Sequence, residues 1–122
     1  MKTILKTEEL AQLAVATIGL YFQPLHFSWW LWILLFLSPD ISMLGYLINT
    51  KTGAVCYNFF HHKLIAIILL IAGYFLQNDI AVCIGLLLYA HSCFDRAMGY
   101  GLKYPDSFHH THLGMIGKSQ TD

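Results

Sequence analysis

The chain of 122 residues is long enough for one domain, and its composition excludes several classes of protein. Hydrophobic residues make up 57% of the chain and charged residues only 11%, whereas soluble domains carry about 25% charged residues. Seven basic and seven acidic side chains leave no net charge, so the composition does not favour binding to nucleic acid. The sequence therefore predicts a membrane protein whose first partner is the lipid bilayer.

Four apolar segments follow one another along the chain, and we interpret each as a transmembrane helix. They cover about residues 8–23, 29–48, 54–76 and 79–98. The last three have about the 20 residues that a helix needs to cross a bilayer. The first has fewer uncharged residues than a full span needs, and we expect it to be either tilted or interfacial. The predicted fold is all-α: a single polytopic membrane domain over residues 1–122, built as a bundle of four transmembrane helices with a short cytoplasmic tail at 99–122.

The basic residues predict the orientation, because lysine and arginine in short loops mark the cytoplasmic side of a membrane. They lie in the N-terminal segment, the second loop and the tail, at Lys2, Lys6, Lys51, Lys103 and Lys118. Four spans put these three segments on one side. We therefore expect a multi-pass protein of the cell membrane with both termini in the cytoplasm and the tail folded back under the helices.

Polar residues interrupt the last three predicted helices at a similar depth, in the cytoplasmic half. They are Asp40 in the second helix, Asn58 and His61 in the third, and His91 and Asp95 in the fourth. A charged side chain at the centre of a bilayer costs about 3 kcal/mol or more, so such residues usually face the bundle interior. Because residues three or four apart share one face of a helix, the two pairs within helices can each point to one place.

Structural interpretations of the same residues stay open. Asp40 follows Pro39 and can cap a helix that restarts at a proline kink. His91 and Asp95 can form a simple hydrogen-bonded pair, and Arg96 can form an ion pair with either aspartate. The convergence of three helices at one depth nevertheless favours a site.

Imidazole and carboxylate groups from several helices suit a divalent metal such as zinc, manganese or iron. We expect His61, His91, Asp95 and His112 to be the metal ligands. Asp40, His91 and Asp95 are the candidate catalytic residues, with Asp40 as a further ligand or as the general base. The histidines of the tail can alternatively form a surface cluster.

The segment that follows the last helix suits an anionic headgroup. Arg96 and Lys103 can bind phosphate and Tyr100 can anchor at the interface, so these three residues and Asn58 are the candidate substrate-binding residues. The alternative for the basic residues is a plain anchor on the cytoplasmic side. Lys63, at the start of the longest apolar run, is expected to extend its stem towards the interface.

Four segments carry a resemblance to a known family: SPDISMLGY at 38–46, YNFFHH at 57–62, AHSCFDRAMGYGLKY at 90–104 and THLGMIG at 111–117. Over nearly the whole chain they resemble a family of small bacterial membrane proteins, the domain of unknown function 4260. The resemblance implies a location in the bacterial inner membrane and motif positions that include Asp40, His61, His91, Asp95 and His112. The arrangement is also distantly similar to the inner-membrane metal-dependent hydrolases known as LexA-binding.

These observations favour a membrane-embedded metal-dependent hydrolase that acts on a lipid-linked or phosphorylated amphiphile from the cytoplasmic side. The alternative is a non-enzymatic membrane protein that binds a metal or haem, or that packs as a subunit on a larger partner. A proton or ion path through the same residues is a third interpretation. A homo-oligomer is expected to help bury the polar face.

Overall fold

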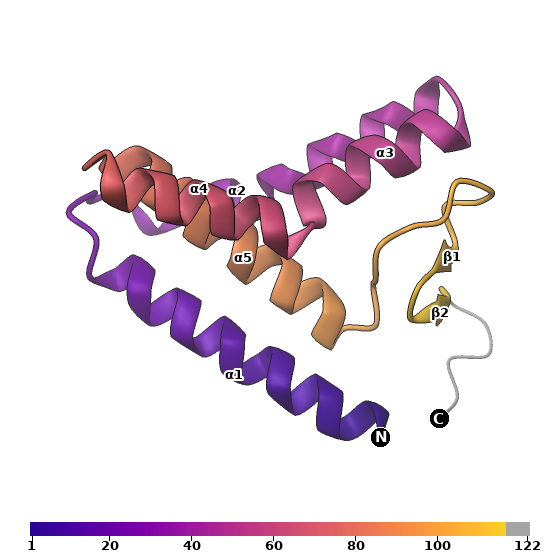
Figure 1. The fold of residues 1–122 in the computed structure, drawn as a ribbon, viewed down its shortest axis with the longest axis horizontal. Helices are drawn as coiled ribbons and strands as arrows, with labels where there is room; N and C mark the ends of the chain where they lie inside the picture. Colours follow the sequence, from indigo (N-terminus) through magenta and orange to yellow (C-terminus); the bar gives the residue numbers. More distant parts are fainter. Residues whose placement is uncertain (117–122) are drawn as a thin grey trace.

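The computed structural model describes residues 1–116 and contains, within that range, five α-helices, one 3₁₀ helix and two short strands (Figure 1). The α-helices are α1 (Lys2–Tyr21), α2 (Trp29–Leu37), α3 (Thr50–His61), α4 (Lys63–Phe75) and α5 (Asp79–Ala97). The 3₁₀ helix η1 (Ser38–Leu47) follows α2 directly, and the tail holds β1 (His110–Thr111) and β2 (Gly114–Met115). The predicted all-α class is confirmed; Lys118 lies outside the described residues.

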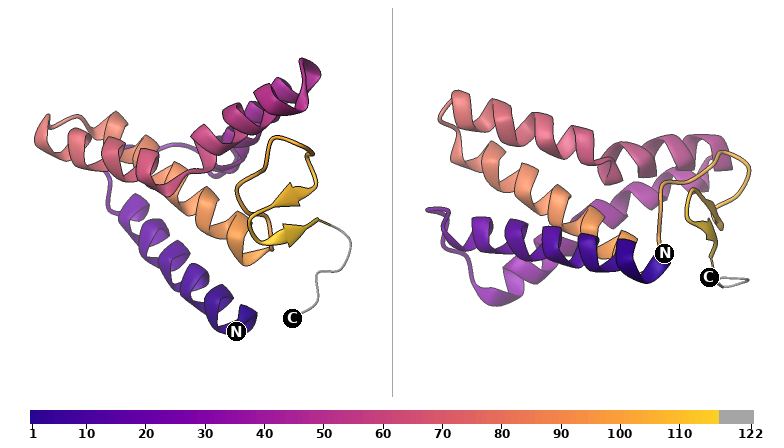
Figure 2. Two further views of the ribbon diagram at one scale, coloured as in Figure 1. Left: turned by 45° about the vertical axis from the view of Figure 1, so that its right-hand side comes forward. Right: turned by 60° about the horizontal axis from the view of Figure 1, so that its bottom comes forward.

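Helix α5 is the centre of the arrangement. α1 and α4 both pack along it, whereas α3 packs against η1 to form a hairpin that extends away from α4 (Figures 1 and 2). The α4–α5 contact is close because glycine lies on α5 where a side chain would not fit. A Cβ atom added at Gly85 would lie 2.7 Å from the backbone nitrogen of Leu70 and 2.9 Å from the carbonyl oxygen of Ala66. Small residues at such positions let helix backbones approach each other.

Two of the predicted spans are found almost where the sequence placed them. Two helical stretches, α2 with η1 (Trp29–Leu47) and α5, are each 19 residues long and apolar enough to cross a membrane by length and composition. The third predicted helix, 54–76, is instead two helices bent by 43°. The bend lies at His62, whose extended backbone (φ −90°, ψ 122°) ends α3 and whose Nδ1 accepts the N–H of Leu64 to cap α4. If this bent pair counts as one span, the described residues contain three candidate spans.

Helix α1, which we expected to be the weakest span, begins at Lys2 rather than near residue 8 and is not among the candidate spans. A polar cluster joins it to the rest of the molecule. Lys63 forms an ion pair with Glu9 and donates a hydrogen bond to Gln12 (2.7 Å), which also accepts from the hydroxyl of Tyr89 (2.8 Å). The ammonium group of Lys63 therefore has both of these partners on α1, and the extension of its stem towards the interface stays a prediction.

The tail turns back towards the helices after α5. Gly99 has a φ of 91°, which glycine adopts without strain, and the N–H of Tyr100 bonds the carbonyl oxygen of Asp95 (2.7 Å) to close the helix. Further along, the side-chain amide of Asn58 donates to the carbonyl oxygen of Lys103 (2.8 Å) and accepts its N–H (2.7 Å). These two bonds attach the tail to α3. Lys103 also forms a β-bridge with Thr111, which joins the later part of the tail to the same point.

Candidate metal centre

Four ionisable side chains from three segments of the chain meet at one point. Asp40 comes from the first turn of η1, His61 from the last turn of α3, and His91 and Asp95 from successive turns of α5. One ligand atom from each residue lies within 4.8 Å of all the others. His61, His91 and Asp95 are buried, whereas the side chain of Asp40 is 37% exposed. These four residues could hold a metal ion, and for that reason we call them the metal centre. Their meeting confirms the predicted convergence of three segments.

The distances between these atoms suit a tetrahedral ion. Nε2 of His61 lies 3.3 Å from Oδ1 of Asp40 and 3.2 Å from Oδ2 of Asp95. Nε2 of His91 lies 3.1 Å and 3.4 Å from the same two oxygens. Zinc bound to nitrogen and oxygen at about 2.0–2.1 Å in a tetrahedron separates its ligand atoms by roughly 3.3 Å. Four of the six distances between ligand atoms are therefore already close to those of such a tetrahedron.

Backbone carbonyl groups fix the protons of both imidazoles. Nδ1 of His61 lies 2.8 Å from the carbonyl oxygen of Tyr57, and Nδ1 of His91 lies 2.7 Å from that of Phe36. A carbonyl oxygen only accepts, so each Nδ1 carries its hydrogen and each Nε2 faces the carboxylates. In a neutral ring, Nε2 would then direct its lone pair at a negatively charged carboxylate, which is unfavourable unless a cation or a proton lies between the two groups. Metal-binding histidines commonly show this same outer hydrogen bond.

Tyr57 supports the centre from one turn below His61. Its ring stacks on the imidazole, with centroids 3.8 Å apart and planes 8° from parallel, and its hydroxyl donates to Oδ2 of Asp95 at 3.1 Å. Ser92 adds a hydrogen bond from its hydroxyl to the carbonyl oxygen of His61 (3.0 Å). Tyr57 belongs to the segment YNFFHH but was not among the site residues predicted from the sequence. Its spacing of four residues from His61 was the available signal, because that spacing puts both on one face of α3.

The family comparison agrees with the motifs that contain these residues. The model described as "Domain of unknown function (DUF4260)" matches residues 2–116. The chain belongs to the DUF4260 family. No curated protein and no solved structure matches the chain. Membership assigns no activity, so the chemistry of this DUF4260 protein has to be argued from its metal centre.

Two of the predicted substrate-binding residues, Asn58 and Lys103, lie near the centre but have partners within the fold. Beyond its main-chain bonds to Asn58, Lys103 donates from Nζ to the carbonyl oxygen of Phe108 (3.0 Å) and lies over the ring of Tyr57, 4.5 Å from its centroid. Burial lowers the pKa of Lys103 to about 8, against the opposing effect of Asp95 and of Asp40. Contact of either residue with a substrate stays a prediction.

The remaining predicted residues lie elsewhere. Arg96, Tyr100 and His112 line a separate cavity between the start of α1, the end of α5 and the tail. Nδ1 of His112 accepts the N–H of Leu102 at 2.8 Å. The cluster thus contains Asp40, which was expected as a further ligand or as the general base, and it does not contain His112.

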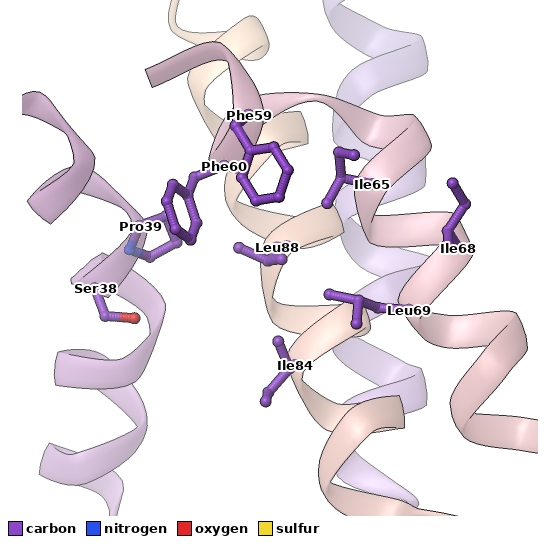
Figure 3. Close-up of a pocket in the computed structure, with 9 residues that line it drawn as sticks. All are labelled: Ser38, Pro39, Phe59, Phe60, Ile65, Ile68, Leu69, Ile84 and Leu88. Carbon is purple, nitrogen blue, oxygen red and sulfur yellow. The ribbon is translucent and has the colours of Figure 1, made fainter. Parts of the chain in front are cut away.

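An apolar cavity of about 630 Å³ adjoins the centre in this DUF4260 chain (Figure 3). Pro39 and Phe60, which line it, are the chain neighbours of Asp40 and His61. Figure 3 shows Ile84 and Leu88 of α5 between Ser38 and Pro39 on one side and isoleucine and leucine side chains of α4 on the other. The α5 positions 84, 88, 91 and 95 are three or four apart, so the cavity lies on the same face of that helix as His91 and Asp95.

Proposed function

We propose that this DUF4260 protein is a membrane-embedded, metal-dependent hydrolase that holds one divalent ion and acts on a lipid-linked or phosphorylated amphiphile from the cytoplasmic side. The observation that supports the ion is the spacing of four ligand atoms around one point, with both Nδ1–H groups already bonded to carbonyl oxygens. Nitrogen and oxygen donors in this number are accepted by zinc, manganese and iron.

The difference in burial between the four side chains suggests a different role for Asp40 than for the other three. His61, His91 and Asp95 are buried and hydrogen-bonded from behind, so they are the ligands in the proposal. Asp40 is more exposed and is either a fourth ligand or the general base that takes a proton from a water molecule. A divalent ion lowers the pKa of a bound water towards neutrality, which is the chemistry that hydrolysis needs.

The surroundings of the centre support an amphiphilic substrate. The apolar cavity lies on the same face of α5 as His91 and Asp95 and has room for a hydrocarbon chain. Only 6% of the apolar window in α2 and η1 is buried within the protein, which suits contact with lipid. A substrate with an apolar chain in this cavity would bring its polar end to Asp40.

A second candidate is a metal-holding membrane protein without turnover. It is favoured by the same tetrahedral spacing, because four protein ligands close a site, whereas catalytic sites keep one position open. The role of Asp40 therefore separates the two candidates.

The metal is tested by elemental analysis of protein purified in detergent from cells supplied with zinc, manganese and iron. We expect about one ion per chain in the wild type, and a loss of most of it in His61→Ala and His91→Ala. His109→Ala is the matched control, because it removes an exposed imidazole from the tail. A wild-type protein without stoichiometric metal, or site variants that bind as much as the control, would refute the proposal.

Hydrolysis is tested separately with Asp40→Asn. Release of phosphate or headgroup from phospholipids and lipid phosphates is measured in mixed micelles. Turnover by the wild type that falls at least 100-fold in Asp40→Asn, with the metal retained, supports the hydrolase. Stoichiometric metal with no turnover of these substrates supports the second candidate.

A further inference from the structure

A second cavity, of about 720 Å³, lies where the start of α1, the end of α5 and the tail come together. Figures 1 and 2 show the N-terminal turn of α1 beside the end of α5 and the tail strands. None of the residues that line this cavity belongs to the metal centre. We call it the basic cavity, because Lys2, Lys6 and Arg96 all line it.

The charges of the basic cavity are unbalanced. Its acidic lining residue, Glu9, is already paired with Lys63 of α4. Within residues 1–116, neither Lys6 nor Arg96 forms an ion pair with a carboxylate. Lys6 and Arg96 therefore bring positive charge to the cavity that no ion pair within residues 1–116 neutralises.

His112 contributes a neutral hydrogen-bond donor. Partial burial, and then the charge of Arg96, lower the pKa of His112, which favours the neutral ring. Because Nδ1 accepts the N–H of Leu102, the single proton of the neutral ring is on Nε2. The lining thus offers the guanidinium group of Arg96, the ammonium group of Lys6 and an imidazole N–H, and a phosphate group accepts hydrogen bonds from all three.

The rest of the lining is apolar. Leu5 of α1, Met98 at the end of α5, and Leu113 and Ile116 of the tail contribute hydrocarbon side chains, and Tyr100 adds an aromatic ring. A fully hydrated anion gains nothing from such surfaces, whereas a molecule with a phosphate at one end and an apolar body at the other matches both halves of the cavity.

We infer that the basic cavity binds the phosphate group of an anionic amphiphile, at a site distinct from the metal centre. Basic pockets between helices on the cytoplasmic side of a membrane suit the headgroups of anionic lipids. The inference rests on the proposed membrane location and orientation but not on the metal or on hydrolysis. The same phosphate chemistry is found in lipid headgroups and in water-soluble phosphorylated compounds, and the experiment distinguishes these two sources.

The test uses the full chain purified in a neutral detergent, with lipid adducts measured by native mass spectrometry. Phosphatidylglycerol is titrated against phosphatidylcholine, and inorganic phosphate is titrated in a parallel series. The variant Lys6→Gln/Arg96→Gln removes two charges from the cavity. Lys51→Gln is the control, because it removes an exposed positive charge from α3, which does not line the basic cavity, on the side of the membrane where both termini are expected. Metal content is measured in every sample to report the integrity of the fold and of the metal centre.

We expect the cavity variant to bind phosphatidylglycerol at least tenfold more weakly than the wild type, with metal content and phosphatidylcholine binding unchanged. The control should bind like the wild type. Displacement of phosphatidylglycerol by inorganic phosphate would support recognition of the phosphate group, and binding of phosphate without the lipid would support a water-soluble ligand.

Equal losses in the cavity variant and the control would show that only non-specific attraction was measured, and would overturn the inference. Binding of both probes by the cavity variant as tightly as by the wild type would also overturn it. Because metal content is recorded separately, a failure of lipid binding in protein that carries its metal leaves the proposed function standing.

Discussion

Oδ1 of Asp40 lies 3.1 Å from Nε2 of His91, although 51 positions separate the two residues in the chain. The same oxygen lies 3.3 Å from Nε2 of His61, so one carboxylate group joins η1 to both α3 and α5. A cation at this point would add a connection between η1, α3 and α5 to the hydrogen bonds that Tyr57 and Ser92 already form between α3 and α5. The metal centre is therefore expected to matter for stability as well as for chemistry.

Removal of the metal should destabilise the protein. A ligand that binds only the folded state, present at 1,000 times its Kd, contributes about 4 kcal/mol to the free energy of unfolding. We expect EDTA to lower the thermal midpoint of the wild type in detergent, as followed by circular dichroism, and to leave the midpoint of His61→Ala unchanged. An equal effect of EDTA on both proteins would contradict a role of the metal centre.

Tyr57→Phe should weaken metal binding while the fold persists. The substitution keeps the ring stacked on His61 but removes the hydrogen bond to Asp95. Loss of such an outer hydrogen bond typically costs 10- to 100-fold in metal affinity, on the order of 1–3 kcal/mol. Competition with a chelating dye measures it. Tyr46→Phe is the control, because the buried hydroxyl of Tyr46 has no hydrogen-bond partner within the described chain, and this variant should bind metal like the wild type.

Gly85→Ala should disrupt the contact between α4 and α5. The added Cβ atom would lie 2.7 Å from a backbone nitrogen of Leu70, so a helix has to move, at a cost of about 1–3 kcal/mol. Gly19→Ala in α1 is the matched change, because its Cβ atom would lie 3.4 Å from a flexible side-chain carbon of Leu86. We expect unfolding in mixed micelles to show a loss of stability in the first variant only. Equal stability of the two variants would refute the close contact.

Lys103 should make stability depend on pH at alkaline values. Its pKa falls from 10.5 in the unfolded chain to about 8 in the fold, so between these values the unfolded chain holds a proton that the folded chain has lost. The free energy of unfolding therefore rises from pH 8 to 10.5, by at most about 3 kcal/mol. Below pH 8 this contribution is absent, because both states are charged.

The pH effect is measured as a difference from Lys103→Met, which lacks the titrating group. We expect the stability of the wild type to increase relative to the variant as pH rises from 8 to 10. A constant difference between the two proteins across this range would show that the ammonium group of Lys103 is not destabilised by burial.

The positions of the apolar helices follow from the sequence. α5 occupies Asp79–Ala97, close to the predicted 79–98, and α2 with η1 ends one residue before the predicted boundary. Both helix positions could be predicted because a continuous apolar run between polar turns is a local property of the sequence. The break at His62 has no such signal, since neither proline nor glycine occurs there, and only the packed structure shows that its side chain caps α4.

The sequence also determined the residue types of the metal centre. The spacing of His91 and Asp95 puts both on one face of α5 whatever the rest of the chain does. It did not determine which further residues join them, because the rotation of each helix about its axis is fixed by packing, as at Gly85 against Leu70. That rotation brings Asp40 and His61 to the centre and Arg96 to the basic cavity, and the turn of the tail after α5 brings His112 to the same cavity. The predicted site residues are therefore divided between two places.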